Sequence, residues 1–187
     1  MRISDSELKR LTVAMEDKNL SFSQVLEFIE NSDLQSEKTI DVVNEIKLTV
    51  DYGKTLEQAI ADGNYDWKND VITAKNFPIS PEMIGKKVEV VTKLFYFNRD
   101  ISSNDGISEM EKADYRPATL MELLALGAVH PELQRQFPIV ALGSVWHWAC
   151  VGRFVPFLYV NDYKRGLKLS FVAGDWGAHY RFLGVRK

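Results

Sequence analysis

Cysteine and histidine are scarce in this chain of 187 residues, which contains one Cys and three His. The single thiol, Cys150, has no second cysteine with which to form a disulfide within the chain or to build a multi-cysteine zinc site. The three histidines are scattered and lack the spacing of metal ligands. We therefore expect no metal site, and packing must provide the stability.

Long apolar runs are missing as well. No segment approaches the roughly 18 apolar residues that a membrane helix requires, so we expect no membrane span. Residues 1–11 include acidic side chains where a signal peptide would need an uninterrupted apolar stretch. The sequence predicts synthesis in the cytoplasm, and it leaves open whether the protein is displayed on a virion or a cell surface.

Groups typical of enzyme sites are also sparse. Cys150 with His147 or His179 would suggest a thiol nucleophile, but the residues around Cys150 show no evident base, orienting group or oxyanion helix. Asp162 and Asp175 are the only carboxylates after Trp146, and no Gly-rich run indicates a phosphate loop. We expect a protein that is not an enzyme, with no catalytic residues and no cofactor.

The net charge is −3, and the charged residues are distributed unevenly along the chain. Residues 1–45 carry 5 Lys or Arg against 10 Asp or Glu, whereas residues 147–187 carry 7 against 2. Positive charge near a C-terminal site would favour anionic ligands. The alternative is that these are ordinary solvated charges on strand faces and at the terminus.

Helical periodicity predicts a small helical element over residues 1–46. Its second helix contributes Glu27 and Glu30 and no Lys or Arg, so it would repel DNA phosphates, and we expect no nucleic-acid partner. The element is expected to serve attachment or oligomerisation, with a cap on the main domain as the alternative. The predicted helices cover residues 3–18, 21–30 and 35–46.

Residues 47–187 are expected to form one α+β ligand-binding domain. A strand at 47–52 is followed by a helix that begins after Thr55 and ends at Gly63. The alternation over 87–97 predicts the longest strand of the chain, at the centre of a sheet.

The second half of this domain is predicted to contain one helix and several short strands. Residues 100–114 are polar and predict a surface loop, and Thr119 with Glu122 forms a capping box for a helix that Gly127 should end. After a short buried strand at 139–142, we expect strands of about four to six residues. These strands are expected to be interrupted at Gly152, Asn161-Asp162, Gly166 and Gly174.

Aromatic residues gather at the C-terminus, where residues 146–187 hold 10 of the 21 in the chain and 3 of the 4 Trp. Tyr and Trp combine a flat apolar area with a polar group, which is typical of recognition surfaces. Trp146 and Trp176 sit among apolar residues and are expected in the core. The aromatic residues expected to contact a ligand are Trp148, Tyr159, Tyr163 and Tyr180.

Four short motifs carry a resemblance to a known family. They are Arg116-Pro-Ala-Thr-Leu, Ala141-Leu-Gly-Ser-Val-Trp146, the turn Gly174-Asp-Trp-Gly177 and the final strand with Arg181-Phe182. With the order of elements, they resemble the C-type-lectin-like fold shared by formylglycine-generating enzymes and the variable proteins of diversity-generating retroelements. The resemblance implies two helices with mostly antiparallel short strands. Formylglycine-generating enzymes use a pair of cysteines, so their catalysis is excluded here.

The resemblance to variable proteins implies a ligand-binding protein whose segment 146–182 is diversified by reverse transcription. Its target would be a macromolecule, either a protein or a glycan. The residues that form the scaffold beneath the variable positions would be Trp146, Val155, Pro156, Leu158, Leu167, Leu169, Trp176 and Phe182. The alternatives are a small hydrolase or transferase at the same surface, and a structural phage or surface-assembly component. The implied ligand-binding residues are His147, Trp148, Ala149, Cys150, Phe154, Phe157, Tyr159, Asn161, Asp162, Tyr163, Ser170, Ala173, Ala178, His179 and Tyr180.

Overall fold

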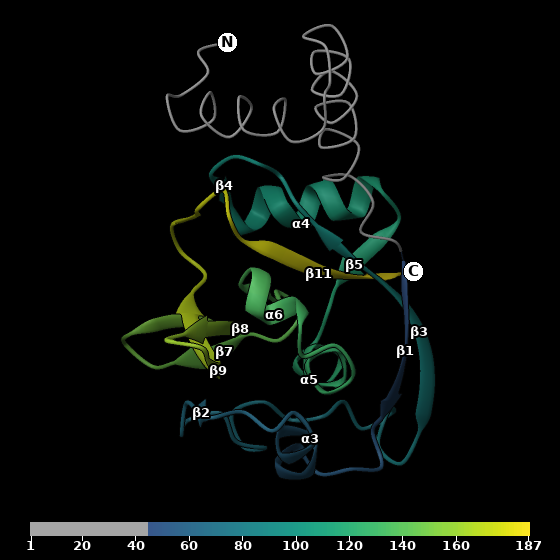
Figure 1. Cartoon of the computed structure of the whole chain (residues 1–187). Helices are drawn as coiled ribbons and strands as arrows, with labels where there is room; N and C mark the ends of the chain where they lie inside the picture. The colour runs from purple at the N-terminus through teal and green to yellow at the C-terminus, as the bar shows by residue number, and fades with distance from the viewer. Residues whose placement is uncertain (1–44) are drawn as a thin grey trace, which may run out of the picture. The chain divides into compact units, whose positions relative to one another are not determined.

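The computed structural model describes residues 45–187, which lie within one compact unit around a large mixed β-sheet (Figure 1). The sheet has nine strands and is antiparallel except where β11 pairs with β6 and β2 pairs with β9. Its main path runs through β1 (Ile46–Asp51), β3 (Lys87–Phe95), β11 (Arg181–Arg186), β6 (Ile139–Val140), β8 (Gly152–Asn161), β9 (Lys164–Phe171) and β2 (Trp67–Lys68). Beside this path, β5 (Tyr115–Pro117) pairs with β11 and β7 (Trp146–Trp148) pairs with β8. A separate two-stranded sheet joins β10 (Asp175–Trp176) to β4 (Ile101–Ser102).

Four helices complete the described residues: α3 (Leu56–Asp62), α4 (Ser103–Lys112), α5 (Leu120–Val129) and α6 (Leu133–Gln136). α5 contacts α3, β1 and β8, and Figure 1 shows it between the β1–β3 end and the β8–β9 end of the sheet. Nearly every side of α5 is buried, because its sequence is apolar around the whole helix. No helix within residues 45–187 is long and apolar enough to cross a membrane.

The predicted C-type-lectin-like arrangement is wrong. The chain forms a nine-stranded mixed sheet with four helices in the described part, instead of two helices with short antiparallel strands. Two of the strands after residue 142 are also longer than the predicted four to six residues, since β8 has 10 and β9 has 8, whereas β7 has 3 and β10 has 2. The motifs behind the resemblance are short and local, and sheet order depends on pairings between residues far apart in the sequence.

The predicted surface loop at 100–114 is wrong too, because it contains α4. Ser102 begins this helix by accepting a hydrogen bond from the Asp105 backbone N–H at 3.1 Å. Only Ser103, Gly106 and Met110 of the helix are buried, so the apolar pattern was too thin to indicate a helix. Phe97 and Phe182 pack close to Gly106, which brings the helix near the sheet.

Two glycines that were predicted to interrupt elements lie inside them. α5 continues to Val129 past Gly127, and β9 runs through Gly166. A Cβ at Gly127 would lie 2.2 Å from the Tyr65 hydroxyl, and one at Gly166 would lie 2.2 Å from the Tyr159 ring. Both glycines therefore permit close packing of an aromatic ring instead of ending an element.

Several local predictions are confirmed. β1, α3 and β3 cover nearly the predicted residues, and a Thr55–Gln58 capping box begins α3. The prediction that β3 is the longest strand, at the centre of the sheet, is wrong, because β8 is one residue longer and β3 is the second strand from one edge. At the start of α5, the Thr119 N–H donates to Glu122 Oε2 at 2.7 Å. The helices predicted over 3–18, 21–30 and most of 35–46 lie outside the described residues, except that Ile46 begins β1 and is not helical.

The Arg116-Pro-Ala-Thr-Leu motif has a structural role. Arg116 makes two hydrogen bonds to Glu122, at 2.6 and 3.0 Å, and the Glu122 side chain is 1 % exposed. This pairing raises the pKa of Arg116, and the Tyr52 hydroxyl lies 3.4 Å from the same carboxylate. The buried carboxylate is thus fully paired where β5 leads into α5.

Trp176 is buried at 4 % exposure, as predicted, within a core that includes Met110, Phe157 and Phe182. Its indole N–H donates to Ser103 Oγ at 2.8 Å, and that hydroxyl donates to the Val172 carbonyl at 2.9 Å. Trp176 therefore connects α4 to the C-terminal segment with its polar atom satisfied.

A buried arginine connects the sheet to three helices. Arg165 on β9 is 5 % exposed and donates to the Gly63 carbonyl at 2.7 Å and the Gly127 carbonyl at 2.6 Å. Its guanidinium also donates twice to Gln134 Oε1, at 3.0 and 3.1 Å. Burial lowers the pKa of Arg165, but an arginine side chain stays protonated in proteins. The charge is thus balanced by carbonyl oxygens at the ends of α3 and α5.

Replacing Arg165 by Met should lower the free energy of unfolding by about 3 kcal/mol or more, since several buried carbonyl oxygens lose their donors. Chemical denaturation of the full chain measures this change. The matched control is Arg153→Met at an exposed position of β8, which should change stability by less than about 0.5 kcal/mol. Equal, small effects of both substitutions would contradict a structural role for Arg165.

Candidate ligand-binding site

Most of the predicted ligand-binding residues lie on two consecutive β-hairpins. β7 and β8 pair with Trp146 opposite Phe154 and Trp148 opposite Gly152. β8 and β9 then pair along their whole length, and Asn161 lies opposite Lys164 next to the turn. The two hairpins share β8, so one rigid strand supports both turns.

The β8–β9 turn holds an exposed aromatic side chain in an unfavourable backbone conformation. Asp162 and Tyr163 form a two-residue loop, with φ of 47° and 64°. Positive φ at both positions is typical of a type I′ turn, where glycine is strongly preferred at the second position. Tyr163 is 90 % exposed, and its carbonyl accepts a hydrogen bond from Arg135 at 3.0 Å. The turn therefore exposes the Tyr163 ring to solvent, where it contributes little to the packing of the fold.

The β7–β8 turn shows the same property. The Val151 N–H donates to the Trp148 carbonyl at 3.0 Å, which closes a turn through Ala149 and Cys150. Cys150 is exposed and has a φ of 63°, in the left-handed region that disfavours side chains with a Cβ. Both hairpin turns thus carry side chains at positions that suit glycine or asparagine better.

An aromatic cluster extends from the β7–β8 hairpin onto β9, and we call it the hairpin patch: Trp146, Trp148, Phe154 and Phe171. The two Trp rings are stacked with centroids 5.4 Å apart, and Phe154 lies 4.2 Å from Phe171. Cross-strand pairing places these rings on one face of the sheet. Trp148 is 50 % and Phe171 47 % exposed, whereas Phe154 is buried beneath them.

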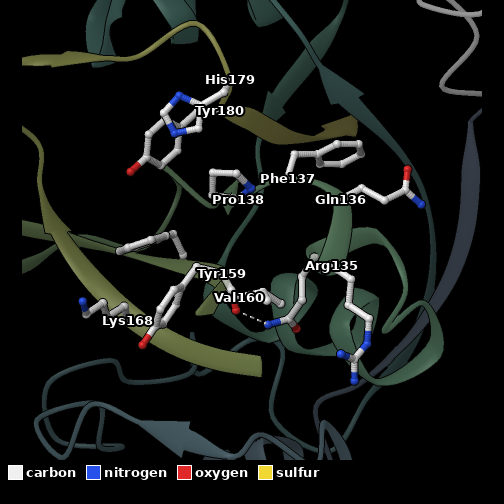
Figure 2. Close-up of a pocket in the computed structure, with 11 residues that line it drawn as sticks. Arg135, Gln136, Phe137, Pro138, Tyr159, Val160, Lys168, His179 and Tyr180 are labelled. Carbon is white, nitrogen blue, oxygen red and sulfur yellow. Dashed lines mark hydrogen bonds between the residues drawn. The ribbon is translucent and has the colours of Figure 1, made fainter. Parts of the chain in front are cut away.

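A concave region lies beside the C-terminal end of β8, apart from the hairpin patch, and we call it the groove (Figure 2). Its volume is about 420 Å³. Figure 2 shows His179 and Tyr180 across the groove from Tyr159, with Pro138 between them. The lining residues are Gln134, Arg135, Gln136, Phe137, Pro138, Phe157, Tyr159, Val160, Lys168, His179 and Tyr180.

Four rings form a continuous aromatic surface along the groove. Phe157 lies 5.7 Å from Tyr159 and 6.2 Å from Tyr180 between ring centroids, and Tyr180 lies 4.5 Å from His179. The interplanar angles of these pairs are 42°, 58° and 43°. The rings are therefore tilted relative to one another and line a curved surface instead of a flat one.

The groove is bordered by positive charge. Lys168 Nζ lies 5.0 Å from the centre of the Tyr159 ring, and Arg135 lines the opposite end. Behind the groove, the Arg181 guanidinium lies 4.6 Å from the Phe137 ring, and burial lowers its pKa. The groove lining contains no Asp or Glu. The local field therefore favours an anionic ligand.

Gln134 fixes the edge of β8 next to the groove. Its side-chain amide donates to the Tyr159 carbonyl at 2.8 Å and is 3.3 Å from the Gly166 carbonyl. Its carbonyl oxygen accepts from Arg165, so the buried arginine network reaches directly to the backbone that carries Tyr159. This support limits rearrangement of the groove wall on binding.

The structure distributes the fifteen predicted residues over several places. His147, Trp148, Ala149 and Cys150 lie at the β7–β8 turn, and Asn161, Asp162 and Tyr163 at the β8–β9 turn. Phe157, Tyr159, His179 and Tyr180 line the groove, and Phe154 forms the base of the hairpin patch. Ser170, Ala173 and Ala178 belong to neither region, and the Ala178 N–H donates to Asp100 at 3.1 Å.

The predicted ligand-binding residues also differ in how far their side chains are exposed to solvent. Phe154 and Phe157 are 9 % and 8 % exposed, so they form the base of the hairpin patch and of the groove, and each offers little contact area of its own. Trp146, expected in the scaffold, is half-buried and stacks on Trp148. The sequence-based prediction missed Phe171, Arg135 and Lys168. The cross-strand partner of Phe154 could have indicated Phe171, but no local pattern connects α6 to β9.

The described residues offer few reactive groups in close proximity. Within residues 45–187, no group of three or more His, Cys, Asp and Glu is arranged to hold a metal ion. Asp162 lies at the β8–β9 turn, whereas Asp175 is on β10. Both carboxylates are exposed.

Comparisons with known proteins give no assignment: no family model, no curated protein and no solved structure matches this chain.

Replacing Tyr163 by Gly should raise the free energy of unfolding by about 0.5–1 kcal/mol, because glycine adopts positive φ without steric cost. Tyr163→Ala is the matched control, since it also removes the ring but keeps a Cβ in the left-handed region. Thermal and chemical denaturation measure both variants. If glycine is no more stable than alanine at this position, backbone strain at the turn is not the cause.

Proposed function

We propose that this protein is a non-enzymatic binding protein whose C-terminal surface recognises a macromolecular ligand, either a protein or a glycan. The supporting observation is the exposure of Trp148 and Tyr163 at the two hairpin turns that flank β8. Trp and Tyr dominate binding energy in recognition surfaces because they bury a large area at a small cost in side-chain entropy.

The backbone beneath these side chains supports the same proposal. Cys150 and Tyr163 occupy left-handed conformations where glycine would be more stable. Unfavourable conformations of this kind concentrate at functional sites. Both turns extend from β8, which the β9 pairing, Gln134 and Arg165 hold in place. A preordered surface loses less conformational entropy on binding.

We also propose that segment 146–182 belongs to a protein diversified by a retroelement. This part rests on the short sequence motifs alone, because the fold that accompanies them in that family is not the fold of this chain. Exposure of His147, Trp148, Asn161, Asp162 and Tyr163 is compatible with frequent replacement, since exposed side chains contribute little to the core.

Sequencing the DNA next to the gene tests the diversification. A reverse-transcriptase gene and a near-repeat of the 3′ coding segment, differing at adenines, are expected. Absence of both from a complete neighbourhood would contradict diversification and would leave the binding function standing.

The binding function predicts that Trp148→Ala combined with Tyr163→Ala weakens binding of the full chain to its protein or glycan ligand at the hairpin turns by about tenfold or more. Panels of immobilised proteins and glycans, followed by surface plasmon resonance, measure this. The matched control combines Ile84→Ala and Val129→Ala, two exposed apolar side chains outside both hairpins, and should bind like the unsubstituted chain.

Two results would contradict the proposal. One is unchanged binding by the Trp148/Tyr163 double variant, or no binding to either panel. The other is turnover of a generic ester, glycoside or phosphate substrate that disappears in Asp175→Asn.

A further inference from the structure

We propose that the groove binds an acidic peptide segment of a partner protein. The proposal rests on the binding function proposed above and adds a second region to it, with its own ligand chemistry. It follows from charge, ring geometry and unengaged polar groups, none of which involves the exposed side chains of the hairpin patch.

The side chains that line the groove carry positive charge. Arg135 and Lys168 are cationic, and the lining contains no carboxylate. Lys168 makes no ion pair with any residue in 45–187, and Arg135 donates only to a backbone carbonyl. Their charges are therefore available to carboxylates of a ligand.

Two phenol hydroxyls of the groove residues have no hydrogen-bond partner among the described residues. Tyr159 and Tyr180 line the groove, and their phenol oxygens make no hydrogen bond to the described residues. Each phenol can donate to a carboxylate or accept from a peptide N–H. An extended peptide supplies both kinds of group at short intervals.

The tilt of the rings favours a peptide over a sugar. Sugar rings stack best on a flat aromatic face, whereas Tyr159 and Tyr180 are inclined by 42° and 58° to the Phe157 ring at the base of the groove. A curved apolar surface suits aliphatic side chains that alternate with acidic ones. The volume of about 420 Å³ also exceeds what a single small anion needs.

An NMR titration of the ¹⁵N-labelled full chain tests the proposal with the peptide Ac-Glu-Asp-Leu-Asp-Glu-Leu-Asp-NH₂. We expect shifts of the amide signals of Tyr159, Lys168 and His179, with a dissociation constant below about 1 mM at low salt. Raising the ionic strength to about 0.5 M should weaken binding several-fold.

A matched pair of substitutions on β9 separates the groove from overall charge. Lys168→Gln should weaken binding by about threefold or more, whereas Lys164→Gln removes the same charge from an exposed position outside the groove and should leave it unchanged.

The proposal is overturned if the peptide does not bind, if Ac-Gln-Asn-Leu-Asn-Gln-Leu-Asn-NH₂ binds equally well, or if Lys164→Gln has the larger effect. It is also overturned if an acidic hyaluronate oligosaccharide, and not the peptide, shifts the groove signals. The Trp148/Tyr163 double variant should still bind the peptide, so failure here is distinguishable from failure of the general binding function.

Discussion

The buried guanidinium of Arg165 determines how the sheet and the helices of this protein fit together. It is attached to β9, yet its donors end on carbonyl oxygens of Gly63, Gly127 and Gln134, at the ends of α3 and α5 and within α6. Carbonyls at helix C-termini carry partial negative charge, so they compensate a cation that has no carboxylate partner there. One residue thereby fixes the β8–β9 hairpin against three helices. Each acceptor would be left unpaired in the interior if the guanidinium were removed.

This network explains why the two binding regions share a rigid base. Gln134 accepts from Arg165 and donates to the Tyr159 carbonyl, which fixes the wall of the groove. The same two strands continue outward to the β8–β9 turn with Tyr163 and, in the opposite direction, to the hairpin patch with Trp148. Exposed aromatic side chains are therefore attached to a backbone that the interior holds in place. Such a division lets the surface be optimised for a ligand without loss of the fold.

The sequence predicted those features that depend on neighbouring residues. The capping residue Thr55 and the alternation in β3 are local signals, and both elements are where they were expected. α4 was missed because few of its residues are apolar, and Gly127 was misinterpreted because its role depends on Tyr65, far away in the sequence. The predicted arrangement of two helices with short antiparallel strands was wrong for the same reason, since strand pairing joins residues that are far apart in the sequence. The groove joins α6 to β8, β9 and the two residues before β11, so no single stretch of sequence could indicate it. The burial of Phe157 follows from strand pairings that only the fold reveals.

Saturation substitution across residues 146–182 of the full chain, read out as resistance to proteolysis, tests most directly whether a rigid scaffold carries an exchangeable surface. The account predicts tolerance of nearly all side chains at His147, Trp148, Asn161 and Tyr163, which are exposed. It predicts loss of resistance at Val155, Leu158, Arg165 and Leu167, which are buried. Similar sensitivity in the two sets, or greater sensitivity at the turns, would contradict it.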